Sequence, residues 1–250
     1  MELVRRALPI RHLPPSLAGR TLAHLSDLHV GALVSDQYLL ETFRRVAGMR
    51  PDIVVVTGDL MSWHHGWVDH VSAIYQQLPR GRLATVATLG NHDYGSLWTN
   101  DTIATQMADI LRSCGVTVLR NQLIEAEGLQ IVGLDDLWAR RFKPEVVLQT
   151  VDPNRAAIAL SHNPDTVDHP GWGSFEGWIL AGHTHGGQCK PPFLPPPILP
   201  VRNRRYTAGE FQLTGNRHLY ISRGIGHSLP VRFNARPEVT IFELEAAGLL

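Results

Sequence analysis

The stretch Ile53-Val54-Val55-Val56-Thr57-Gly58-Asp59 decides the fold of this chain. A short run of apolar and β-branched residues is typical of a strand that is buried on both faces of a sheet. It ends in a glycine, which permits a tight turn, and an aspartate, which offers a carboxylate. Four more strand-like runs end in polar motifs of the same kind, which read Asp27-Leu28-His29, Gly90-Asn91-His92-Asp93, Ser161-His162-Asn163 and Gly182-His183-Thr184-His185.

The spacing of the first three motifs indicates an α/β fold. Asp27, Asp59 and Asn91 follow one another at intervals of 32 residues, which is about the length of one βαβ unit. Parallel strands joined by crossover helices end at the same edge of a sheet, and open α/β sheets bind ligands there. We therefore expect the three side chains to converge.

Apolar runs alternate with longer helical patterns along the rest of the chain. The first expected helix has one apolar face made of Leu39, Leu40, Phe43, Val46 and Ala47, and Asp36 is expected to cap its start. Asp135-Asp136 is interpreted as a helix start, with a place behind the polar motifs as the alternative. Strands are expected over residues 21–25, 53–57, 85–89, 129–134, 156–160, 177–181, 219–222 and 239–244, and helices over 36–49, 67–78 and 99–113.

Size and composition limit the class of protein. A chain of 250 residues that is 44% apolar can form one α/β domain with a substantial core, and no linker divides it. The 23 basic and 23 acidic residues cancel, so nucleic acid is not expected as a partner. Two cysteines without a motif fit a reducing compartment, and the absence of a signal-like or membrane-spanning stretch predicts a cytoplasmic protein. The sequence sets no oligomeric state.

The motif residues include every kind of side chain that a metal-dependent hydrolytic site needs. Two aspartates, one asparagine and several histidines suit a pair of divalent cations, and the absence of thiolate favours manganese, iron or zinc. A carboxylate in the position of Asp59 can bridge two cations. A water molecule shared by the two cations then gives hydroxide near neutral pH, which can attack a phosphoester. His92 is expected to project toward the leaving group as general acid, with Asp93 holding its ring.

The five motifs in this order resemble the calcineurin-like metallophosphoesterase superfamily over about residues 20–245. The resemblance implies a four-layer αββα sandwich of two mixed sheets, with residues 219–244 in the second sheet. It implies a first metal site made of Asp27, His29, Asp59 and His185. It implies a second site made of Asp59, Asn91, His162 and His183, with Asp59 bridging the two.

A narrower resemblance comes from the C-terminal third. Gly186-Gly187-Gln188, Tyr220-Ile221-Ser222-Arg223-Gly224 and Pro230-Val231-Arg232-Phe233 are similar to a bacterial branch of membrane-associated phosphodiesterases. That branch and its neighbours include hydrolases of UDP-2,3-diacylglucosamine, so the resemblance implies a phosphodiester or pyrophosphate that is linked to a lipid. The alternatives are a phosphomonoesterase or protein phosphatase of the same superfamily, or a non-catalytic metal-binding scaffold.

Residues 191–200 contain six prolines, which exclude a helix or a central strand. In one interpretation this loop is an apolar flap packed on the core. In the other it is a wall for an acyl chain or a peripheral contact with the inner membrane, and nearby arginines bind substrate or anionic head groups. The arginines of this interpretation are Arg202, Arg204, Arg205 and Arg223, of which Arg223 has pairing with an acid as its alternative.

Overall fold

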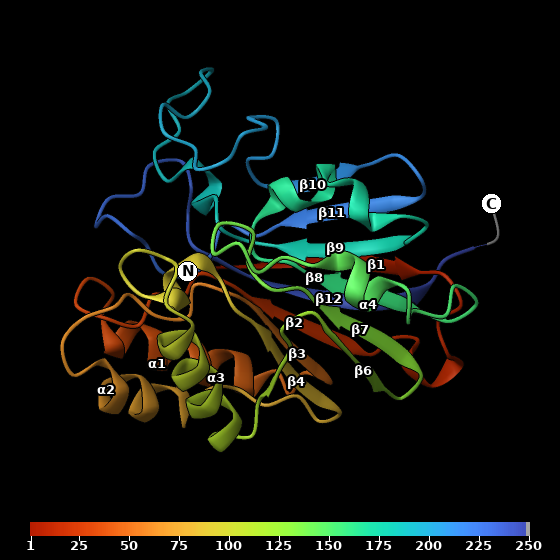
Figure 1. Cartoon of the computed structure of the whole chain (residues 1–250), viewed down its shortest axis with the longest axis horizontal. Coiled ribbons are helices and arrows are strands. Elements are labelled where there is room, and N and C mark those ends of the chain that lie inside the picture. The colour runs from red at the N-terminus through yellow and green to blue at the C-terminus, as the bar shows by residue number, and fades with distance from the viewer. Residues whose placement is uncertain (249–250) are drawn as a thin grey trace.

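The computed structural model describes residues 1–248, and Figure 1 shows two sheets packed face to face. The strands are β1 (Glu2–Ile10), β2 (Thr21–Leu25), β3 (Ile53–Thr57), β4 (Ala84–Thr88), β5 (Thr117–Val118), β6 (Gln122–Ala126), β7 (Leu129–Gly133), β8 (Ala157–Leu160), β9 (Gly177–Ala181), β10 (Gly209–Gln212), β11 (Arg217–Ile221) and β12 (Glu238–Ala246). The helices are α1 (Asp36–Gly48), α2 (Trp67–Tyr75), α3 (Asp101–Ser113) and α4 (Pro144–Leu148). Short 3-10 helices are η1 (Pro15–Leu17), η2 (Asn91–Tyr94), η3 (Pro164–Asp168), η4 (Pro170–Trp172) and η5 (His185–Gly187).

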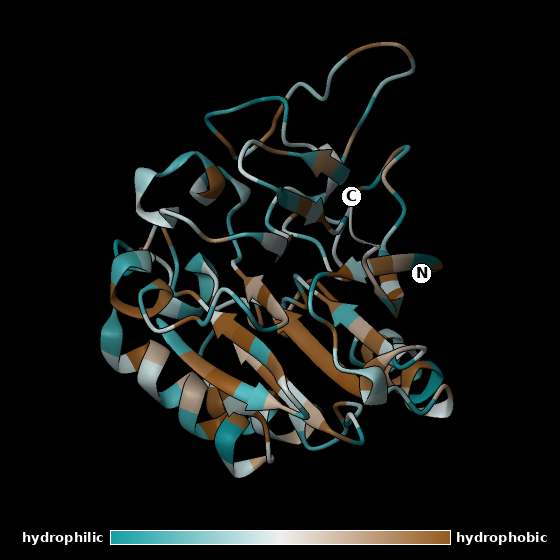
Figure 2. Ribbon diagram, turned by 90° about the vertical axis from the view of Figure 1, so that its right-hand side faces the viewer, coloured by the Kyte–Doolittle hydropathy of each residue, from teal (hydrophilic) through white to brown (hydrophobic). Residues whose placement is uncertain are grey.

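The strands of the first sheet bury both of their faces. Its order is β1-β12-β2-β3-β4-β5, and that of the second sheet is β10-β11-β9-β8-β7-β6. Along β3, Val54 and Val56 pack toward the helices, while Ile53 and Val55 pack into the core between the sheets. The alternation follows from the two-residue period of a strand, and it explains why β3 reads as a continuous apolar run. The brown strands of Figure 2 mark this apolar interior.

Four layers result, as the sequence predicted. Helices α1, α2 and α3 cover the outer face of the first sheet (Figure 1). The outer face of the second sheet is covered more thinly, by α4, η3 and η4, with Trp172 and Phe175 in the same apolar cluster as Ile179. The αββα sandwich is therefore confirmed, although its second helical layer consists of short helices.

The sequence predicted the central strands to within a few residues but missed β1, β5, β6 and β10. These strands lie at or next to the sheet edges, and exposed polar residues interrupt their apolar pattern. The expected place of the last strand was wrong. β12 pairs with β1 and β2 in the first sheet and does not join the second. The chain thus returns to the first sheet after β11.

Three local predictions also differ from the structure. Ser35, not Asp36, occupies the N-cap of α1, and the Asp36 carboxylate instead contacts Nε2 of His70 at 2.8 Å. Ala47 is exposed, so the buried stripe of α1 ends at Val46. Asp135-Asp136 is followed by a turn and not by a helix, and both carboxylates are buried in contacts described below.

None of the helices in residues 1–248 has the length and hydropathy that a membrane-spanning helix requires.

Candidate metal centre

The polar motifs of the sequence meet where the carboxyl ends of the two sheets come together. Strands β2, β3 and β4 are parallel neighbours in the first sheet, and β8 and β9 are parallel neighbours in the second. Each of these strands ends one to five residues before a motif side chain. All seven candidate ligands are buried, and they are Asp27, His29, Asp59, Asn91, His162, His183 and His185.

One group of donors contains Asp27, His29, Asp59 and His185, and one ligand atom of each lies within 4.8 Å of the others. Nε2 of His29 is 3.1 Å from Nε2 of His185 and 3.5 Å from Oδ2 of Asp59. Nε2 of His185 is 3.4 Å from Oδ1 of Asp27. Donor atoms that surround one cation at about 2 Å lie about 3 Å apart, so these separations suit a metal ion.

A second group shares Asp59 with the first. Nε2 of His162 lies 3.2 Å from Oδ2 of Asp59, and Nδ1 of His183 lies 3.1 Å from Nε2 of His162. Two adjacent buried His/Asp groups with one carboxylate in common form the pattern of a dinuclear divalent metal site.

The asparagine of the third motif supports this assignment. The side chain of Asn91 is 1% exposed, and neither its oxygen nor its nitrogen has a hydrogen-bond partner within residues 1–248. A buried amide without partners costs about 1–3 kcal/mol. An amide oxygen that binds a cation would gain a partner and lower that cost, so the residues present fit a metal pair.

Most of the candidate ligands have a left-handed backbone. The φ values of Asp27, His29, Asp59, His183 and His185 lie between 49° and 72°. Residues other than glycine adopt this region at a cost of about 1 kcal/mol or more each, and such strain clusters at functional sites. The turns after β2, β3 and β9 therefore aim their side chains inward at the expense of local stability.

Gly182 is required by close packing beside the ligands. A Cβ atom at this position would clash with Oγ of Ser26 and with the carboxylate of Asp27. The sequence predicted a close backbone approach at the motif glycines, and at Gly182 the reason is that the turns after β2 and β9 lie against each other.

Hydrogen bonds behind the ligands fix which ring nitrogen each histidine turns toward the metal centre. Nδ1 of His162 lies 2.8 Å from the carbonyl of Thr57, so it donates there and leaves Nε2 for the centre. Nδ1 of His29 lies 3.2 Å from Oγ of Ser62. Nδ1 of His185 accepts from Nη2 of Arg232 at 3.0 Å, because a guanidinium can only donate.

Arg232 contacts the candidate ligand His185, and the sequence did not predict this contact. Its Nη1 also donates to the carbonyls of His185, at 3.2 Å, and Ala235, at 3.1 Å. Burial lowers its pKa to about 10, so it stays charged. A basic residue between Val231 and Phe233 was the available signal, but nothing in the sequence showed that it lies behind a ligand.

Burial and charge set the protonation of the histidines. Burial lowers the pKa of His29 and of His183 to about 3 each, which leaves neutral rings suited to metal binding. Burial would also lower the pKa of His162, but the carboxylates of Asp59 and Asp27 raise it to about 10. These carboxylates favour the protonated ring while no cation is bound, whereas a metal ion binds the neutral ring.

His92 lies at the edge of this centre. Its backbone N–H donates to Oδ1 of Asp59 at 2.9 Å, and its ring is 4.9 Å from that of His29. The ring is only half-buried, whereas the ligand rings are buried. This position allows contact with a molecule in the cavity.

The expected contact between Asp93 and the ring of His92 is wrong. Oδ1 of Asp93 accepts from the backbone N–H groups of Leu60, at 2.8 Å, and Met61, at 3.1 Å. Its Oδ2 accepts from the N–H of Gly90 at 2.8 Å. Three backbone donors occupy this carboxylate, so Asp93 braces the turns that carry Asp59 and His92.

Comparison with known proteins decides the family. The family model described as calcineurin-like phosphoesterase matches residues 20–187. The chain belongs to the calcineurin-like phosphoesterase family. It is therefore a metal-dependent phosphoester hydrolase, as the order of the five motifs predicted.

Relatives of known sequence extend over nearly the whole chain. The chain is 32% identical to the phosphodiesterase YaeI of Escherichia coli, over 97% of this chain and 88% of the relative. It is 32% identical to the uncharacterized metallophosphoesterase YkuE of Bacillus subtilis, over 99% of this chain and 87% of the relative. It is 26% identical to the UDP-2,3-diacylglucosamine pyrophosphatase LpxG of Chlamydia trachomatis, over 90% and 83%.

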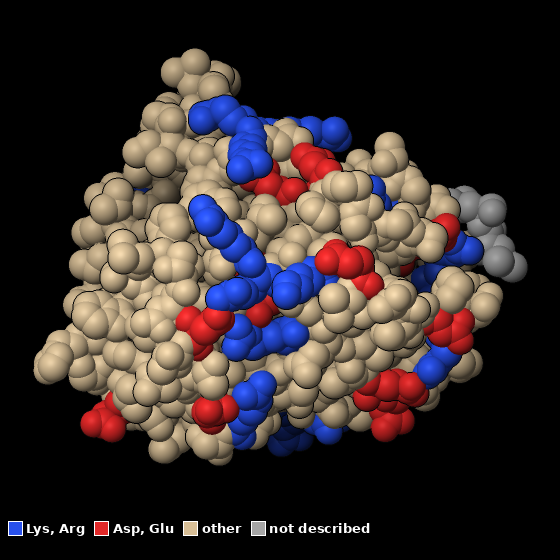
Figure 3. Space-filling model, viewed as in Figure 1, with Lys and Arg blue, Asp and Glu red and all other residues tan. Residues whose placement is uncertain are grey.

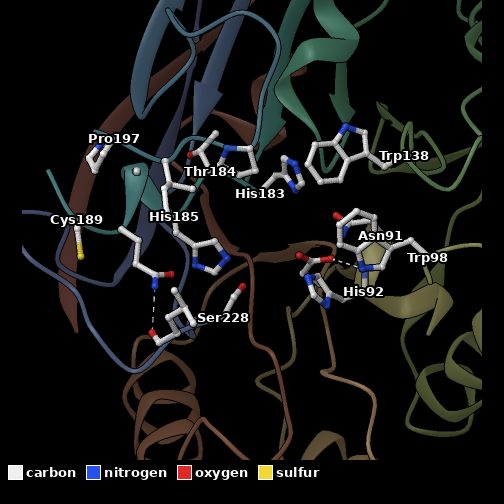
Figure 4. A pocket seen from close by; sticks show the side chains of 16 residues that line it. Asn91, His92, Trp98, Trp138, His183, Thr184, His185, Cys189, Pro197 and Ser228 are labelled. Atoms are coloured by element: carbon white, nitrogen blue, oxygen red, sulfur yellow. Dashed lines mark hydrogen bonds between the residues drawn. The ribbon is translucent and has the colours of Figure 1, made fainter. Parts of the chain in front are cut away.

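In this calcineurin-like phosphoesterase a cavity of about 250 Å³ opens over the centre. Figure 4 shows its floor formed by Asn91, His92, His183 and His185. Tryptophans stand on the His92 side, and Cys189 and Pro197 stand on the opposite side. The remaining lining residues are Asp59, Trp98, Trp138, Thr184, Gly187, Gln188, Ile198, Pro200, Ser228 and Leu229.

Arg223 was expected to bind substrate or to pair with an acid, and the structure shows the pairing. Its guanidinium forms ion pairs with Glu238 and, at 2.9 Å, with Glu2, which neutralise it. The alternative of pairing with an acid is therefore correct.

The three loop arginines are exposed and also lie outside the cavity lining within the described residues. Arg204 donates to the carbonyl of Pro196 at 2.6 Å, and Arg205 lies over the ring of Phe211. Arg202 has an exposed side chain, and its backbone N–H donates to Asp165. Their role in binding substrate or anionic head groups therefore stays a prediction.

Proposed function

We propose that this chain is a dinuclear-metal-dependent phosphodiesterase in which His92 is the general acid. The observation that carries the proposal is the set of contacts made by the Asp59 carboxylate. Its Oδ2 faces histidines of both donor groups, while its Oδ1 accepts from the backbone of His92. One carboxylate thus links both metal positions to the candidate proton donor.

The ligand assignment follows the two donor groups. Asp27, His29, Asp59 and His185 would hold the first cation, and Asp59, Asn91, His162 and His183 would hold the second. Divalent ions bound there supply an activated water and neutralise charge on the phosphoryl oxygens. Oxygen and imidazole donors without thiolate suit manganese, iron or zinc, and we expect one of these.

The chain's own residues then divide the remaining work. The half-buried ring of His92 gives its proton to the departing oxygen as the phosphorus–oxygen bond breaks. The bond from its backbone to Asp59 keeps this ring beside the centre. The buried side chains of the centre keep bulk water away from the cavity floor and strengthen each charge interaction there.

The second part of the proposal concerns the substrate, which we infer to be linked to a lipid. The cavity wall opposite the tryptophans is aliphatic, with Pro197, Ile198 and Leu229. A wall of this kind suits an acyl chain better than a polar headgroup. The name of LpxG, a UDP-2,3-diacylglucosamine pyrophosphatase, supports a substrate of this class.

The same wall continues to the surface as an apolar rim, which we define as Phe193, Leu194, Ile198, Leu229, Val231 and Phe233. The fractional exposure of these side chains is 55% or more. The two rim segments lie side by side, since the N–H of Lys190 donates to the carbonyl of Phe233 at 2.9 Å. An exposed apolar patch that borders a cavity is typical of an interaction surface.

We infer that the rim rests on a membrane surface, which would make the protein peripheral to the inner membrane. The loop of residues 191–200 projects from the body, and Figure 3 shows an uncharged tip with basic side chains below it. The exposed arginines Arg202, Arg204 and Arg205 belong to the segment that follows the loop. Apolar side chains above cations match the order of acyl region and anionic head groups. The cytoplasmic location stays a prediction.

Hydrolysis assays test the proposal. Bis-p-nitrophenyl phosphate should be hydrolysed with added Mn²⁺ and not after treatment with a chelator. A lipid-linked diester should then be a better substrate than a water-soluble one, and a variant shortened over residues 192–199 should lose this preference alone. Failure to hydrolyse any phosphodiester in the presence of manganese, iron or zinc would refute the proposed reaction. Equal losses on both substrates would refute the lipid wall.

A further inference from the structure

Two indole rings form the cavity wall beside His92. The ring of Trp98 stacks on that of Trp138 with a centroid distance of 5.1 Å and an interplanar angle of 29°. Trp98 lies 5.7 Å from the ring of His92, and Trp138 packs at 4.4 Å on the ring of His183. Both indoles are half-buried, and Figure 4 shows them on the side of Asn91 and His92. The pair is thus open to the cavity next to the proton donor.

The backbone of Trp98 is held in an unfavourable conformation. Its φ is 58°, which is a rare left-handed value for a bulky residue. The turn is closed by the N–H of Trp98, which donates to the carbonyl of Gly95 at 3.1 Å. Gly95 itself has a φ of 81° and packs against Ile103. A conformation that costs energy at the rim of a cavity is a reason to look for a function.

A buried polar network joins the two segments that carry the indoles. The hydroxyl of Tyr94 donates to Oδ1 of Asp135 at 2.5 Å, and Nε of Arg120 donates to Oδ2 of the same carboxylate at 2.8 Å. Nη2 of Arg120 also donates to the Tyr94 hydroxyl at 2.9 Å. On the Trp138 side, Oδ1 of Asp136 accepts from the N–H of Ala139 at 2.7 Å. These bonds fix both tryptophan turns before any molecule enters the cavity.

We propose that Trp98 and Trp138 form a stacking platform for a planar ring carried by the leaving group of the substrate. The proposal rests on the proposed function, because the leaving group is the part that His92 must reach. Trp98 packs on His92, so a group that receives its proton lies against the indoles. The aliphatic wall across the cavity is then left for the other half of the substrate.

The two indoles determine which kind of ring the substrate can place against them. Indole faces favour offset stacking with a planar π system, and a nucleobase is a ring of this class. A quaternary ammonium group is the other common partner of tryptophan. It is disfavoured here because the indoles stack on each other and do not form a cage. The platform also adjoins a centre where Arg232 and two divalent cations would repel a cation.

Binding of small phosphates to the manganese-loaded enzyme tests the platform. Uridine 5′-monophosphate and adenosine 5′-monophosphate carry a base, and ribose 5-phosphate carries the same phosphate without one. We expect the nucleotides to bind roughly 5- to 150-fold more tightly, as one stacked base provides. Trp98→Leu and Trp138→Leu should remove this difference and leave binding of ribose 5-phosphate unchanged. Trp98→Phe should retain most of it.

The matched control is Trp63→Leu, which removes an exposed tryptophan that lies outside the cavity lining. It should leave all three affinities unchanged. The platform is refuted if ribose 5-phosphate binds as tightly as the nucleotides, or if the leucine variants keep the difference. It is also refuted if phosphocholine binds more tightly than the nucleotides and loses affinity in the same variants.

Kinetics separate this proposal from the proposed function. The substrates are two diesters that differ only in the leaving alcohol, which is a nucleoside in one and methanol in the other. Trp138→Leu should raise KM for the nucleoside ester by the factor found in binding, and it should change the kinetics of the methyl ester far less. Equal loss of kcat on both esters would mean that the indoles only position His92, and the platform fails. Hydrolysis of neither ester by the wild type would instead refute the phosphodiesterase.

Discussion

Nη2 of Arg232 donates to Nδ1 of His185 at 3.0 Å, from the side of the ring that faces away from the metal centre. The same guanidinium bonds to the carbonyls of His185 and Ala235, so it holds the ligand and its turn together. The ring is thereby fixed with Nε2 toward Asp27 and His29. A partner of this kind determines how well a ligand is oriented before the cation arrives.

Arg232→Met should therefore weaken metal binding. The loss expected for a contact behind a ligand is about 10- to 100-fold in affinity. Titration of the metal-free protein with Mn²⁺ by calorimetry measures it, with no need for an activity. Arg155→Met is the control, since Arg155 forms an exposed ion pair with Glu125 and should leave affinity unchanged. Identical affinities for the wild type and the Arg232 variant would exclude the orienting role.

His92→Asn should reduce turnover by about 10²–10⁴-fold while the metal content stays the same. The reason is that an amide cannot give a proton to the leaving oxygen. The loss should be largest for an alkyl leaving group and smaller for p-nitrophenolate, which departs as an anion without protonation. His65→Asn, at an exposed position, should have wild-type kinetics. A uniform loss for both leaving groups, or none, would remove His92 from the chemical step.

Asp59→Asn should abolish tight binding of both cations, because this carboxylate belongs to both donor groups. Asp27→Asn should affect only the first group. Elemental analysis after dialysis counts the retained ions. Asp52→Asn is the matched control, because Asp52 is a buried carboxylate at the other end of β3 that bonds to Thr21. Two retained ions in the Asp59 variant would contradict the bridging assignment.

Much of this centre could be predicted from sequence because its geometry is set by topology. A buried parallel strand reads as an apolar run, and β3 is continuous from Ile53 to Thr57. The residue after such a strand must lie at the carboxyl edge of the sheet. The sequence alone therefore predicted that Asp59 and Asn91 lie close together, although they are far apart in the chain.

Contacts that depend on side-chain packing could not be predicted in this way. Asp93 follows His92 directly, which made an ion pair seem natural, yet three backbone donors surround its carboxylate. Arg223 and Arg232 look alike in sequence, but one is neutralised by glutamates and the other lies behind a ligand. Edge strands such as β10 were not predicted for a different reason. Their side chains are exposed, so they lack the apolar alternation that identifies a strand in the sequence.

Removing the apolar rim should weaken membrane binding. Burial of one large apolar side chain contributes about 1.5–3 kcal/mol, so Phe193→Ser and Leu194→Ser should each reduce partition into vesicles by roughly tenfold or more. Cosedimentation with vesicles of anionic phospholipid measures the effect. Thermal stability should not change, because both side chains are exposed. Val146→Ser, an exposed position on α4, is the control. Unchanged partition of a variant that carries both Phe193→Ser and Leu194→Ser would exclude the rim as the membrane contact.

Acidification should destabilise the fold through His24, which lies between the sheets with Nε2 at 2.8 Å from Oγ1 of Thr57. Burial lowers its pKa from 6.5 to about 3. Between these values the unfolded chain binds a proton at His24 that the folded chain does not, so His24 alone lowers the free energy of unfolding by roughly 1.4 kcal/mol per pH unit below 6.5. His24→Leu should remove this contribution and keep that of the buried histidines of the metal centre, since Thr57 keeps its bond to Ser26. Urea unfolding of the metal-free protein at pH 7 and 4.5 measures it, with exposed His12→Leu as control. Equal slopes in the wild type and the His24 variant would contradict it.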